Sequence, residues 1–496
     1  MIFFKKKNKI LNLLNITAEM INLLDQELNL KTALENCMKA IEVVEDNLEG
    51  ELASDNEAVF DDLQVVHDAL QLIYQEEVQL DDNLEQKLYL MIMSIQKKLD
   101  KSIPIKLNVV FMPYKVTMWD SLASIYEMAA KDPDCVAKVV PIPYFKLTKD
   151  QAIPTYEGKL FPKDVPVTSY QDYNLAKEDP DIIFIHNAYD QYNTITQVDK
   201  RFFTSNLKKY TDMLVYVPYH ITGFGRLSGN NQYITYTMPT MPNIDRIVVA
   251  GNFVKDAAIK YGVPAEKVLV LGSPKMDAVY QATKSSKKIP KKWEKQIAGK
   301  FVFALDTNCM SLVNNPFYEF AYIEQVFDAA KMISNCAVIW RPHPLTKIAI
   351  AHYIPQMLEK YDHLVNDIKS CSPKYPNIIV DESPEYISFF NASDAYVSIP
   401  NSLMALYTVT GKPIVIASKV LNDELLLPDT AFYHFYDPEH PWYKIAQDLI
   451  NGKDPKRNSR RNLASQIYNY TDGTSGKMIY QEIKREVILK TAGETK

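Results

Sequence analysis

The spacing of hydrophobic residues changes at Pro104, the first proline of the chain. Before it, apolar residues recur every three or four positions in a stretch rich in Leu, Glu, Gln, Asp and Lys. This spacing predicts two or three helices, joined by short turns, in an α-helical unit over residues 1–103. Leu63, Val66 and Leu70 show the helical repeat, and we expect them to pack in the core of this unit. A seam between two copies of the chain is the alternative.

From residue 104 onward, short runs that are apolar at nearly every position alternate with helical stretches. Such runs are typical of parallel strands covered by helices on both faces of the sheet. The first set of strands is predicted at 105–111, 136–142, 182–186, 213–217, 246–250 and 268–271. We expect these strands to form one Rossmann-like domain over residues 104–283.

A second set of strands follows a basic, proline-containing stretch at residues 284–295, which we interpret as an exposed linker. Its strands are predicted at 301–305, 337–340, 378–380, 395–398 and 413–417, with a helix near 318–334. They predict a second Rossmann-like domain over residues 296–496, which also includes the C-terminal helices. Sheets of this kind bind ligands beyond the carboxyl ends of their strands, so two such edges could face each other.

Charge and cysteine content narrow the functional classes. The net charge of −6 divides unevenly, with 9 Lys and Arg against 20 Asp and Glu in residues 1–100 and 46 against 41 in the remainder. The modestly basic remainder favours an anionic ligand but falls short of a nucleic-acid-binding surface, so no nucleic-acid partner is expected. The five cysteines form no C-x-x-C pair, and no signal or membrane-spanning pattern is present. We expect a cytoplasmic protein without a disulfide framework.

Several motif-defined classes are absent from the sequence. None of the patterns G-x-x-x-x-G-K-[ST], G-x-G-x-x-G and G-x-S-x-G occurs, which argues against P-loop ATPases, common dinucleotide enzymes and ordinary α/β-hydrolases. No cofactor is expected. His434 and His440 have carboxylates nearby, but we interpret their aromatic, proline-rich surroundings as a packed loop. Because no D-x-D stands at a strand's carboxyl end either, no metal site is expected.

Arg341 and His343 follow the strand predicted at 337–340, in the sequence Arg-Pro-His-Pro. We expect both side chains at the carboxyl edge of the second sheet, held by the stiff flanking prolines and projecting toward solvent or ligand. Arginine offers a planar fork of donors for phosphate, and histidine can donate a hydrogen bond or a proton. The alternative is a strand-end arginine in a salt bridge and a histidine that caps the next turn.

Two further segments of the second domain reach the same edge. Asn401 or Ser402 begins a short helix that ends at Gly411, and a helix start offers N–H groups to a phosphate. The alternative is that both residues only cap the helix, although capping and phosphate contact can coexist. Asp306 follows the strand at 301–305 and is a weaker candidate for contact with a donor substrate.

Two histidines of the first domain are candidate general bases. His220 follows the strand at 213–217, and His186 ends the strand at 182–186. A histidine on a loop that faces the cleft could remove a proton from an incoming hydroxyl. The alternative for His220 is a structural hydrogen-bonding role among neighbouring tyrosines.

Three motifs resemble the CDP-glycerol glycerophosphotransferase family. They are Gly272-Ser-Pro-Lys-Met-Asp277, Arg341-Pro-His-Pro344, and Ser402 placed before Gly411-Lys-Pro413, and the resemblance covers about residues 210–420. It implies a metal-independent transferase with a GT-B fold of two facing Rossmann-like domains. The implied reaction moves glycerol phosphate from CDP-glycerol to a hydroxyl of a cell-envelope polymer, such as a teichoic acid. In this scheme Arg341 and His343 hold the donor's pyrophosphate, Ser402 contacts phosphate and His220 is the base.

The sequence departs from the family pattern before Gly411. Ile399-Pro-Asn-Ser402 and Leu406 stand where the family has D-Y-S-S and a second aspartate, so two carboxylates are missing. The donor therefore stays open. The alternatives are a GT-B glycosyltransferase that uses a nucleotide sugar and, from another class, a non-catalytic scaffold of envelope assembly.

The extreme start of the sequence suggests where such a protein acts. Residues 1–10 place two phenylalanines beside four lysines, which suits peripheral contact with an anionic membrane surface on the inner face of the cell membrane. A frayed, solvated end is the alternative. Residues 1–103 are also expected to mediate self-association. The expected partners are thus a nucleotide-linked donor, a polymer or lipid-linked acceptor, the membrane and a second copy of the chain.

Overall fold

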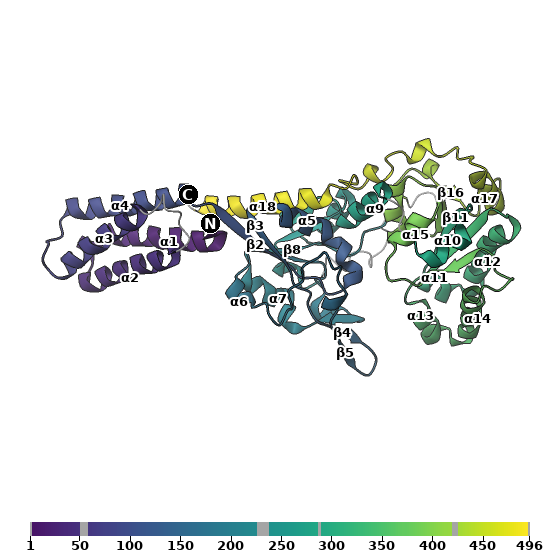
Figure 1. Ribbon diagram of the computed structural model, residues 1–496, viewed down its shortest axis with the longest axis horizontal. Coiled ribbons are helices and arrows are strands. Elements are labelled where there is room, and N and C mark those ends of the chain that lie inside the picture. Colours follow the sequence, from purple (N-terminus) through teal and green to yellow (C-terminus); the bar gives the residue numbers. More distant parts are fainter. Residues whose placement is uncertain (1, 50–57, 226–237, 286–288, 419–424, 495–496) are drawn as a thin grey trace.

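A helical bundle and two α/β domains follow one another along the chain (Figure 1). The computed structural model describes residues 2–49, 58–225, 238–285, 289–418 and 425–494. In this part of the chain, no helix combines the length and apolar character that crossing a lipid bilayer requires. The order of elements confirms the predicted α/β fold with a preceding helical unit.

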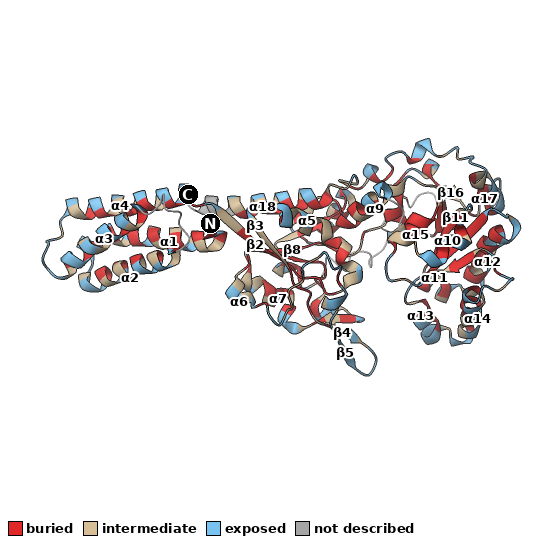
Figure 2. Cartoon of the chain, viewed as in Figure 1, coloured by how far each residue is buried: buried red, intermediate tan, exposed pale blue. Residues whose placement is uncertain are grey.

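The described residues of the N-terminal unit form a bundle of four α-helices, where the sequence predicted two or three helices. Its helices are α1 (Phe4–Ile21), α2 (Leu30–Leu48), α3 (Ala58–Tyr74) and α4 (Asp82–Ser102). Helix α1 packs against α2 and α4, and α3 packs against the same two helices. Leu63, Val66 and Leu70 are fully buried in the bundle core, as predicted, and Figure 2 shows the buried stripes facing inward. Asn29 and Asp81 cap α2 and α4 by accepting backbone N–H groups.

The first α/β domain contains a parallel sheet in the order β3-β2-β6-β8-β9-β10. Its strands, close to the predicted ranges, are β2 (Ile105–Phe111), β3 (Cys135–Val139), β6 (Ile182–Ile185), β8 (Met213–Tyr216), β9 (Arg246–Val249) and β10 (Val268–Val270). The principal helices around it are α5 (Ala123–Lys131), α8 (Asn252–Lys260) and α9 (Pro274–Lys284). A small antiparallel sheet, which the sequence analysis missed, is formed by β4 (Tyr144–Leu147), β5 (Ala152–Thr155) and β7 (Thr196–Val198).

The second α/β domain contains a parallel sheet in the order β13-β12-β11-β14-β15-β16. These strands are β11 (Phe301–Thr307), β12 (Cys336–Pro342), β13 (Ile378–Val380), β14 (Ala395–Ser398), β15 (Ile414–Ile416) and β16 (Tyr433–His434). The principal helices are α10 (Lys291–Ile297), α11 (Cys309–Asn314), α12 (Pro316–Met332), α13 (Thr346–Tyr353), α14 (Leu358–Lys369), α15 (Ile387–Ala392), α16 (Ser402–Tyr407) and α17 (Trp442–Ile450). Two parallel sheets in tandem confirm the predicted GT-B-like architecture.

The predicted exposed linker at 284–295 needs correction. Helix α9 continues to Lys284 and α10 begins at Lys291, while residues 286–288 lie outside the described residues. Trp293, inside the predicted linker, is 1% exposed and packs in the core of the second domain. The second domain therefore begins within the stretch that was interpreted as a linker. The prediction failed because the basic composition of this stretch outweighed its one apolar anchor, Trp293.

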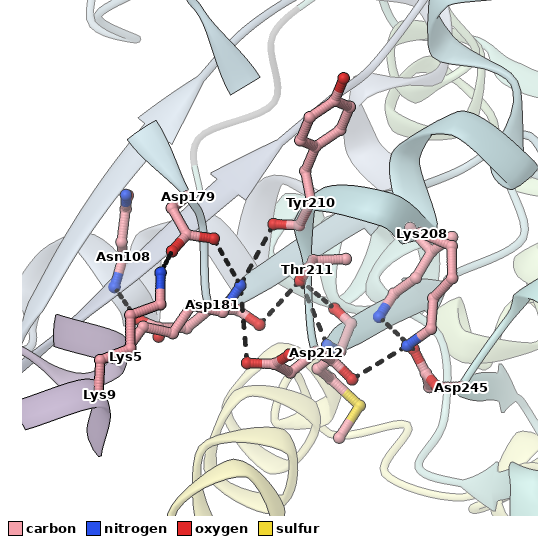
Figure 3. Close-up of polar contacts among 12 residues, drawn as sticks. Lys5, Lys9, Asn108, Asp179, Asp181, Lys208, Tyr210, Thr211, Asp212 and Asp245 are labelled. Atoms are coloured by element: carbon pink, nitrogen blue, oxygen red, sulfur yellow. Dashed lines mark hydrogen bonds and ion pairs between the residues drawn. The ribbon is translucent and has the colours of Figure 1, made fainter. Parts of the chain in front are cut away.

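The first residues of the chain are built into the first α/β domain. Strand β1 (Ile2–Phe3) pairs in parallel with the start of β2, and Phe4 is buried in the same core as that strand. The ammonium groups of Lys5 and Lys9 lie 3.0 and 2.7 Å from the carboxylate oxygens of Asp179, as Figure 3 shows. The boundary predicted at residue 103 therefore does not separate the two units. Lys5 and Lys9 form ion pairs within the chain, with Asp179 of the first domain.

A long C-terminal helix, α18 (Ser475–Glu494), returns to the first domain and lies along it in Figure 1. It packs against α5 and α9, and its Ile479 and Ile483 are fully buried with the first sheet. The carboxylate of Asp277 accepts the N–H groups of Ser475 and Gly476 at 3.0 and 2.7 Å. The boundary predicted at 296–496 is therefore wrong for this helix, which belongs by packing to the first domain.

Candidate functional site at the facing strand ends

The candidate site lies at the carboxyl edge of the second sheet, where β11, β12 and β14 end side by side. Asp306, near the end of β11, is buried at this edge. One of its carboxylate oxygens accepts hydrogen bonds from the Tyr396 hydroxyl at 3.0 Å and the Asn401 amide at 2.7 Å. Burial raises the pKa of Asp306, while these two hydrogen bonds oppose the shift. Asp306 thus holds Tyr396 and Asn401 in place at this edge of the sheet.

Asn401 links Asp306 to the start of α16. Its Oδ1 accepts the backbone N–H of Met404 at 2.8 Å, so the side chain caps the helix while its Nδ2 donates to Asp306. The oxygen and the nitrogen of this side-chain amide are therefore both hydrogen-bonded within the protein, in agreement with the capping alternative. Ser402, the next residue, is exposed at the start of the helix. Its hydroxyl is better placed than the Asn401 amide to meet a ligand.

Arg341 does not project freely from the strand end, which corrects the sequence prediction. Strand β12 continues through Pro342, and Arg341 pairs in register with Asp306. Its buried guanidinium forms an ion pair with Asp381 and donates to the carbonyls of Ser383 and Glu385, both at 2.9 Å. The salt-bridge alternative therefore describes this arginine. It holds the loop after β13 by these hydrogen bonds. Its positive charge also acts electrostatically on Asp306 at the edge of the sheet.

His343 is exposed at the same edge and keeps a free hydrogen-bonding direction. The backbone N–H of Leu345 donates to its Nδ1 at 3.2 Å, which assigns the proton of a neutral ring to Nε2. Partial removal from water lowers the pKa of His343, and the carboxylate of Asp306 opposes that shift. At neutral pH His343 therefore offers one N–H group that can donate to a ligand.

His220 lies on the loop after β8 in the first domain. The ring is half-buried, and burial, followed by the nearby charge of Lys275, lowers its pKa to about 4. A ring with this pKa is neutral at physiological pH and can accept a proton, although it is a weaker base than an exposed histidine. Among the described residues the ring of His220 packs edge-on against Tyr219, with centroids 5.5 Å apart, and no hydrogen bond to it is found there.

The loop that carries His220 reaches into the second domain. Phe224 stacks on Phe432, with ring centroids 5.3 Å apart, and the Thr222 carbonyl accepts a hydrogen bond of 2.8 Å from the Tyr468 hydroxyl. A Cβ atom at Gly223 would lie 3.5 Å from the backbone oxygen of Asn401. The carboxyl edges of the two sheets therefore meet, and the loop of the candidate base touches the segment that begins α16.

His186, the competing base, has a structural role. Its ring is completely buried, its Nε2 accepts the N–H of Tyr114 at 3.1 Å, and its Nδ1 faces the Ser121 hydroxyl at 3.1 Å. Burial lowers the pKa of His186 to about 3. Because both ring nitrogens are engaged inside the first domain, this histidine is not available to a substrate.

A polar contact between the two domains was missed by the sequence analysis. The ammonium of Lys275 lies 2.6 Å from a carboxylate oxygen of Asp120, and the Tyr386 hydroxyl of the second domain donates to the same oxygen at 2.7 Å. The ammonium also lies 4.9 Å from the centroid of the Tyr386 ring. Lys275 belongs to the Gly-Ser-Pro-Lys motif, but no periodicity in the sequence points to Tyr386 as its partner.

Carboxylates and histidines elsewhere form ordinary pairs. His434 lies 2.9 Å from Asp429, and His440 lies 3.4 Å from Asp437. Within the described ranges no group of three or more His, Cys, Asp and Glu side chains is arranged to hold a metal ion. The candidate site therefore consists of Asp306, His343, Asn401 and Ser402 from the second domain and His220 from the first.

Comparison with known proteins finds similarity only among solved structures. No family model matches the chain, and no curated protein matches it. The wall teichoic acid polymerase TagF is 13% identical with a TM-score of 0.46, covering 77% of this chain and 90% of that one. The UDP-GlcNAc 2-epimerase of Methanocaldococcus jannaschii is 14% identical with a TM-score of 0.47, covering 76% of this chain and 100% of that one.

A third solved structure of the same kind is MnaA of S. aureus, solved with UDP. It is 12% identical to this chain with a TM-score of 0.47, covering 77% of this chain and 97% of that one. These likenesses concern the fold.

Proposed function

We propose that this chain is a metal-independent transferase that moves glycerol phosphate, or a related phosphopolyol, from a CDP-linked donor to a hydroxyl of a cell-envelope polymer. The observation that carries the proposal is the meeting of two strand edges, where the His220 loop places Gly223 against the backbone of Asn401. The loop of a neutral base in one domain thus touches the segment that begins α16 in the other, which supports placing His220 opposite the exposed donors His343 and Ser402. The motifs shared with glycerophosphotransferases support the choice of donor.

In the proposed reaction the acceptor hydroxyl gives its proton to the imidazole of His220. The acceptor oxygen attacks the β-phosphorus of the donor, the bond from that phosphorus to the bridging oxygen breaks, and CMP leaves with the electron pair. His343 donates from Nε2 to the charged phosphate oxygens, and the hydroxyl and N–H groups at Ser402 add further hydrogen bonds. Arg341 acts indirectly, by holding the loop at 381–385 and by its charge.

A nucleotide-linked donor and an envelope acceptor together imply work at the cytoplasmic face of the cell membrane. We propose peripheral attachment there, with self-association through the helical bundle. Because Lys5 and Lys9 are paired with Asp179, attachment would involve other surfaces besides the first ten residues. A lipid-linked acceptor would bring the enzyme to the membrane by itself.

Two alternatives are separated by their ligands. A GT-B glycosyltransferase would bind a nucleotide sugar at the same edge. This donor is an alternative because the two carboxylates of the family pattern are missing. A scaffold would bind no nucleotide, and the use of the Arg341 guanidinium inside the protein is the observation in its favour. The exposed His343 and Ser402 at one strand edge favour an enzyme.

The experiment is a thermal-shift series with CMP, UMP, GMP and CDP-glycerol, because a ligand that binds the folded state raises its melting temperature. We expect cytidine nucleotides to give the largest shift and CMP to be released from CDP-glycerol with an acceptor polymer. His343→Ala and Ser402→Ala should reduce both signals, whereas His363→Ala, at an exposed position on α14, should change neither. A largest shift with UMP or GMP supports the glycosyltransferase, and the absence of any shift supports the scaffold.

A further inference from the structure

A cavity of about 450 Å³ lies away from the candidate site, at the opposite end of α16. Its walls come from Tyr280 of α9, the turn at Thr408–Thr410 that follows α16, and residues 457–472, which lead to α18. It thus lies where the first domain, the second domain and the returning segment of chain meet. Neither the Arg-Pro-His-Pro motif nor any other candidate residue lines it.

Arginines are concentrated in the wall of this cavity. Three of the eight arginines of the sequence fall within residues 457–461, and all three line the cavity. In the described part of the chain the other arginines pair with carboxylates, as in the pairs Arg201–Asp199, Arg246–Glu486, Arg341–Asp381 and Arg485–Glu482. Arg457 and Arg461 are exposed, and neither guanidinium has an ion pair or hydrogen bond with a described residue.

Arg460, between these two residues, is a fixed buried charge. It is 2% exposed and forms an ion pair with Asp454, and its Nε donates to the Gly411 carbonyl at 3.4 Å. Its Nη1 has no hydrogen-bond partner among the described residues. A buried guanidinium nitrogen without an acceptor is unfavourable, because its N–H groups have lost their hydrogen bonds to water without forming new ones in the protein. An anion in the adjoining cavity would supply negative charge at this point.

We propose that this cavity binds a small phosphorylated polyol or sugar. The planar forks of Arg457 and Arg461 match the oxygens of a phosphoryl group, and the buried charge of Arg460 reinforces them. The carboxylate of Asp472 and the hydroxyl of Thr410, also in the wall, can accept hydrogen bonds from the hydroxyl groups of the ligand. Asp472 also opposes the accumulation of negative charge, which favours a phosphomonoester over a polyphosphate.

The test measures binding to the full chain by isothermal titration calorimetry, with glycerol 3-phosphate, inorganic phosphate and glycerol as probes. We expect glycerol 3-phosphate to bind more tightly than inorganic phosphate, and glycerol not to bind. The double variant Arg457→Gln with Arg461→Gln should weaken glycerol 3-phosphate binding by at least about tenfold, since each removes a charge-assisted hydrogen bond. Arg485→Gln, which changes an exposed arginine on α18, is the matched control and should bind as the wild type.

A second pair of variants separates this cavity from the candidate catalytic site. Ser402 lies at the other end of α16 and His343 follows β12, so His343→Ala and Ser402→Ala should leave glycerol 3-phosphate binding unchanged. If these variants abolish binding while the double arginine variant retains it, the ligand occupies the sheet edge and the proposal is wrong. Equal binding of glycerol and glycerol 3-phosphate, or no binding of either phosphorylated probe at millimolar concentration, would also overturn it.

Discussion

The hydroxyl of Tyr386 in the second domain donates a hydrogen bond of 2.7 Å to the carboxylate of Asp120 in the first. The same carboxylate is paired with Lys275, and Tyr386 is buried. The residue before Tyr386, Glu385, presents the carbonyl that accepts a hydrogen bond from Arg341. The contact between the two domains is thus joined directly to the loop that Arg341 holds.

Replacing Tyr386 with phenylalanine tests this relationship. The variant keeps the ring over Lys275 but removes the hydrogen bond to a charged carboxylate, which should lower the free energy of unfolding by about 1.5–3 kcal/mol. Urea unfolding checks the loss, and small-angle scattering should show a larger radius of gyration if the domains separate. Tyr443→Phe, at a 40% exposed tyrosine of α17, is the control and should leave both measurements unchanged. An unaltered stability of Tyr386→Phe would contradict the interpretation.

Arg341 and His343 should respond differently to substitution, although they are two residues apart. Arg341→Ala leaves the carboxyl of Asp381, 1% exposed, without its partner, which should destabilise the fold by about 3–5 kcal/mol. His343→Ala removes an exposed ring and should change the unfolding free energy little while it reduces donor binding. Chemical denaturation followed by nucleotide titration separates the two effects. A fully stable Arg341→Ala protein that no longer binds donor would restore the direct role of this arginine.

His186 should make stability depend on pH. Its folded pKa of about 3 lies below the ordinary value of 6.5, so the unfolded state binds a proton first and stability falls as the pH decreases from about 6.5 toward 3. Between about pH 7.5 and pH 5 this group should contribute a loss of about 2 kcal/mol. The pH dependence of the urea midpoint should be weaker in His186→Gln and unchanged in His363→Gln, the exposed control. The same slope in His186→Gln and wild type would contradict the prediction.

His220 should shift the acid limb of the activity profile. Because burial and the charge of Lys275 lower its pKa to about 4, the ring remains deprotonated, and therefore competent as a base, well below pH 6.5. The pH profile of kcat/KM for CMP release should stay flat down to about pH 5, and His220→Gln should lose most of the turnover. A profile that falls near pH 6.5 in the wild-type protein would show that the base is a different or more exposed group.

Two adjacent phenylalanines distinguish a structural from a membrane role for the start of the chain. Phe4 is 8% exposed in the core of the first domain, whereas Phe3 is 43% exposed. Phe4→Ala should lower the unfolding free energy by about 3 kcal/mol through the cavity that it leaves, and Phe3→Ala should have a small effect. Liposome sedimentation of both variants is the companion measurement. Equal stability together with reduced liposome binding in both variants would support the membrane role instead.

The strands could be predicted because each is a short apolar run, and burial on both faces of a parallel sheet requires that composition. The position of Asp306 and Ser402 at a shared edge follows from the same rule, since Asp306 directly follows the strand predicted at 301–305 and Ser402 begins the helix after the strand predicted at 395–398. Arg341 was placed at the correct edge but given the wrong partners. The sequence does not reveal that β12 continues by two residues, nor that Asp381 emerges from the next strand to bind the guanidinium.

Contacts between segments far apart in the sequence could not be predicted. Strand β1 pairs with β2 across the whole helical bundle, and Asp277 caps a helix that starts almost 200 residues later. Neither contact leaves a periodic signal, because periodicity records only which face of a single element is buried. For the same reason the sequence could not predict the contact between Tyr386 and Asp120.

The return of α18 to the first domain has a consequence for biosynthesis. A ribosome delivers β2, with the buried residues Leu107 and Val109, hundreds of residues before it delivers Ile479 and Ile483, which complete the same apolar core. The second domain is made entirely in between and can fold as a unit on its own sheet. The nascent first domain therefore waits with an uncovered apolar surface, and we expect it to be the part of the emerging chain that chaperones occupy.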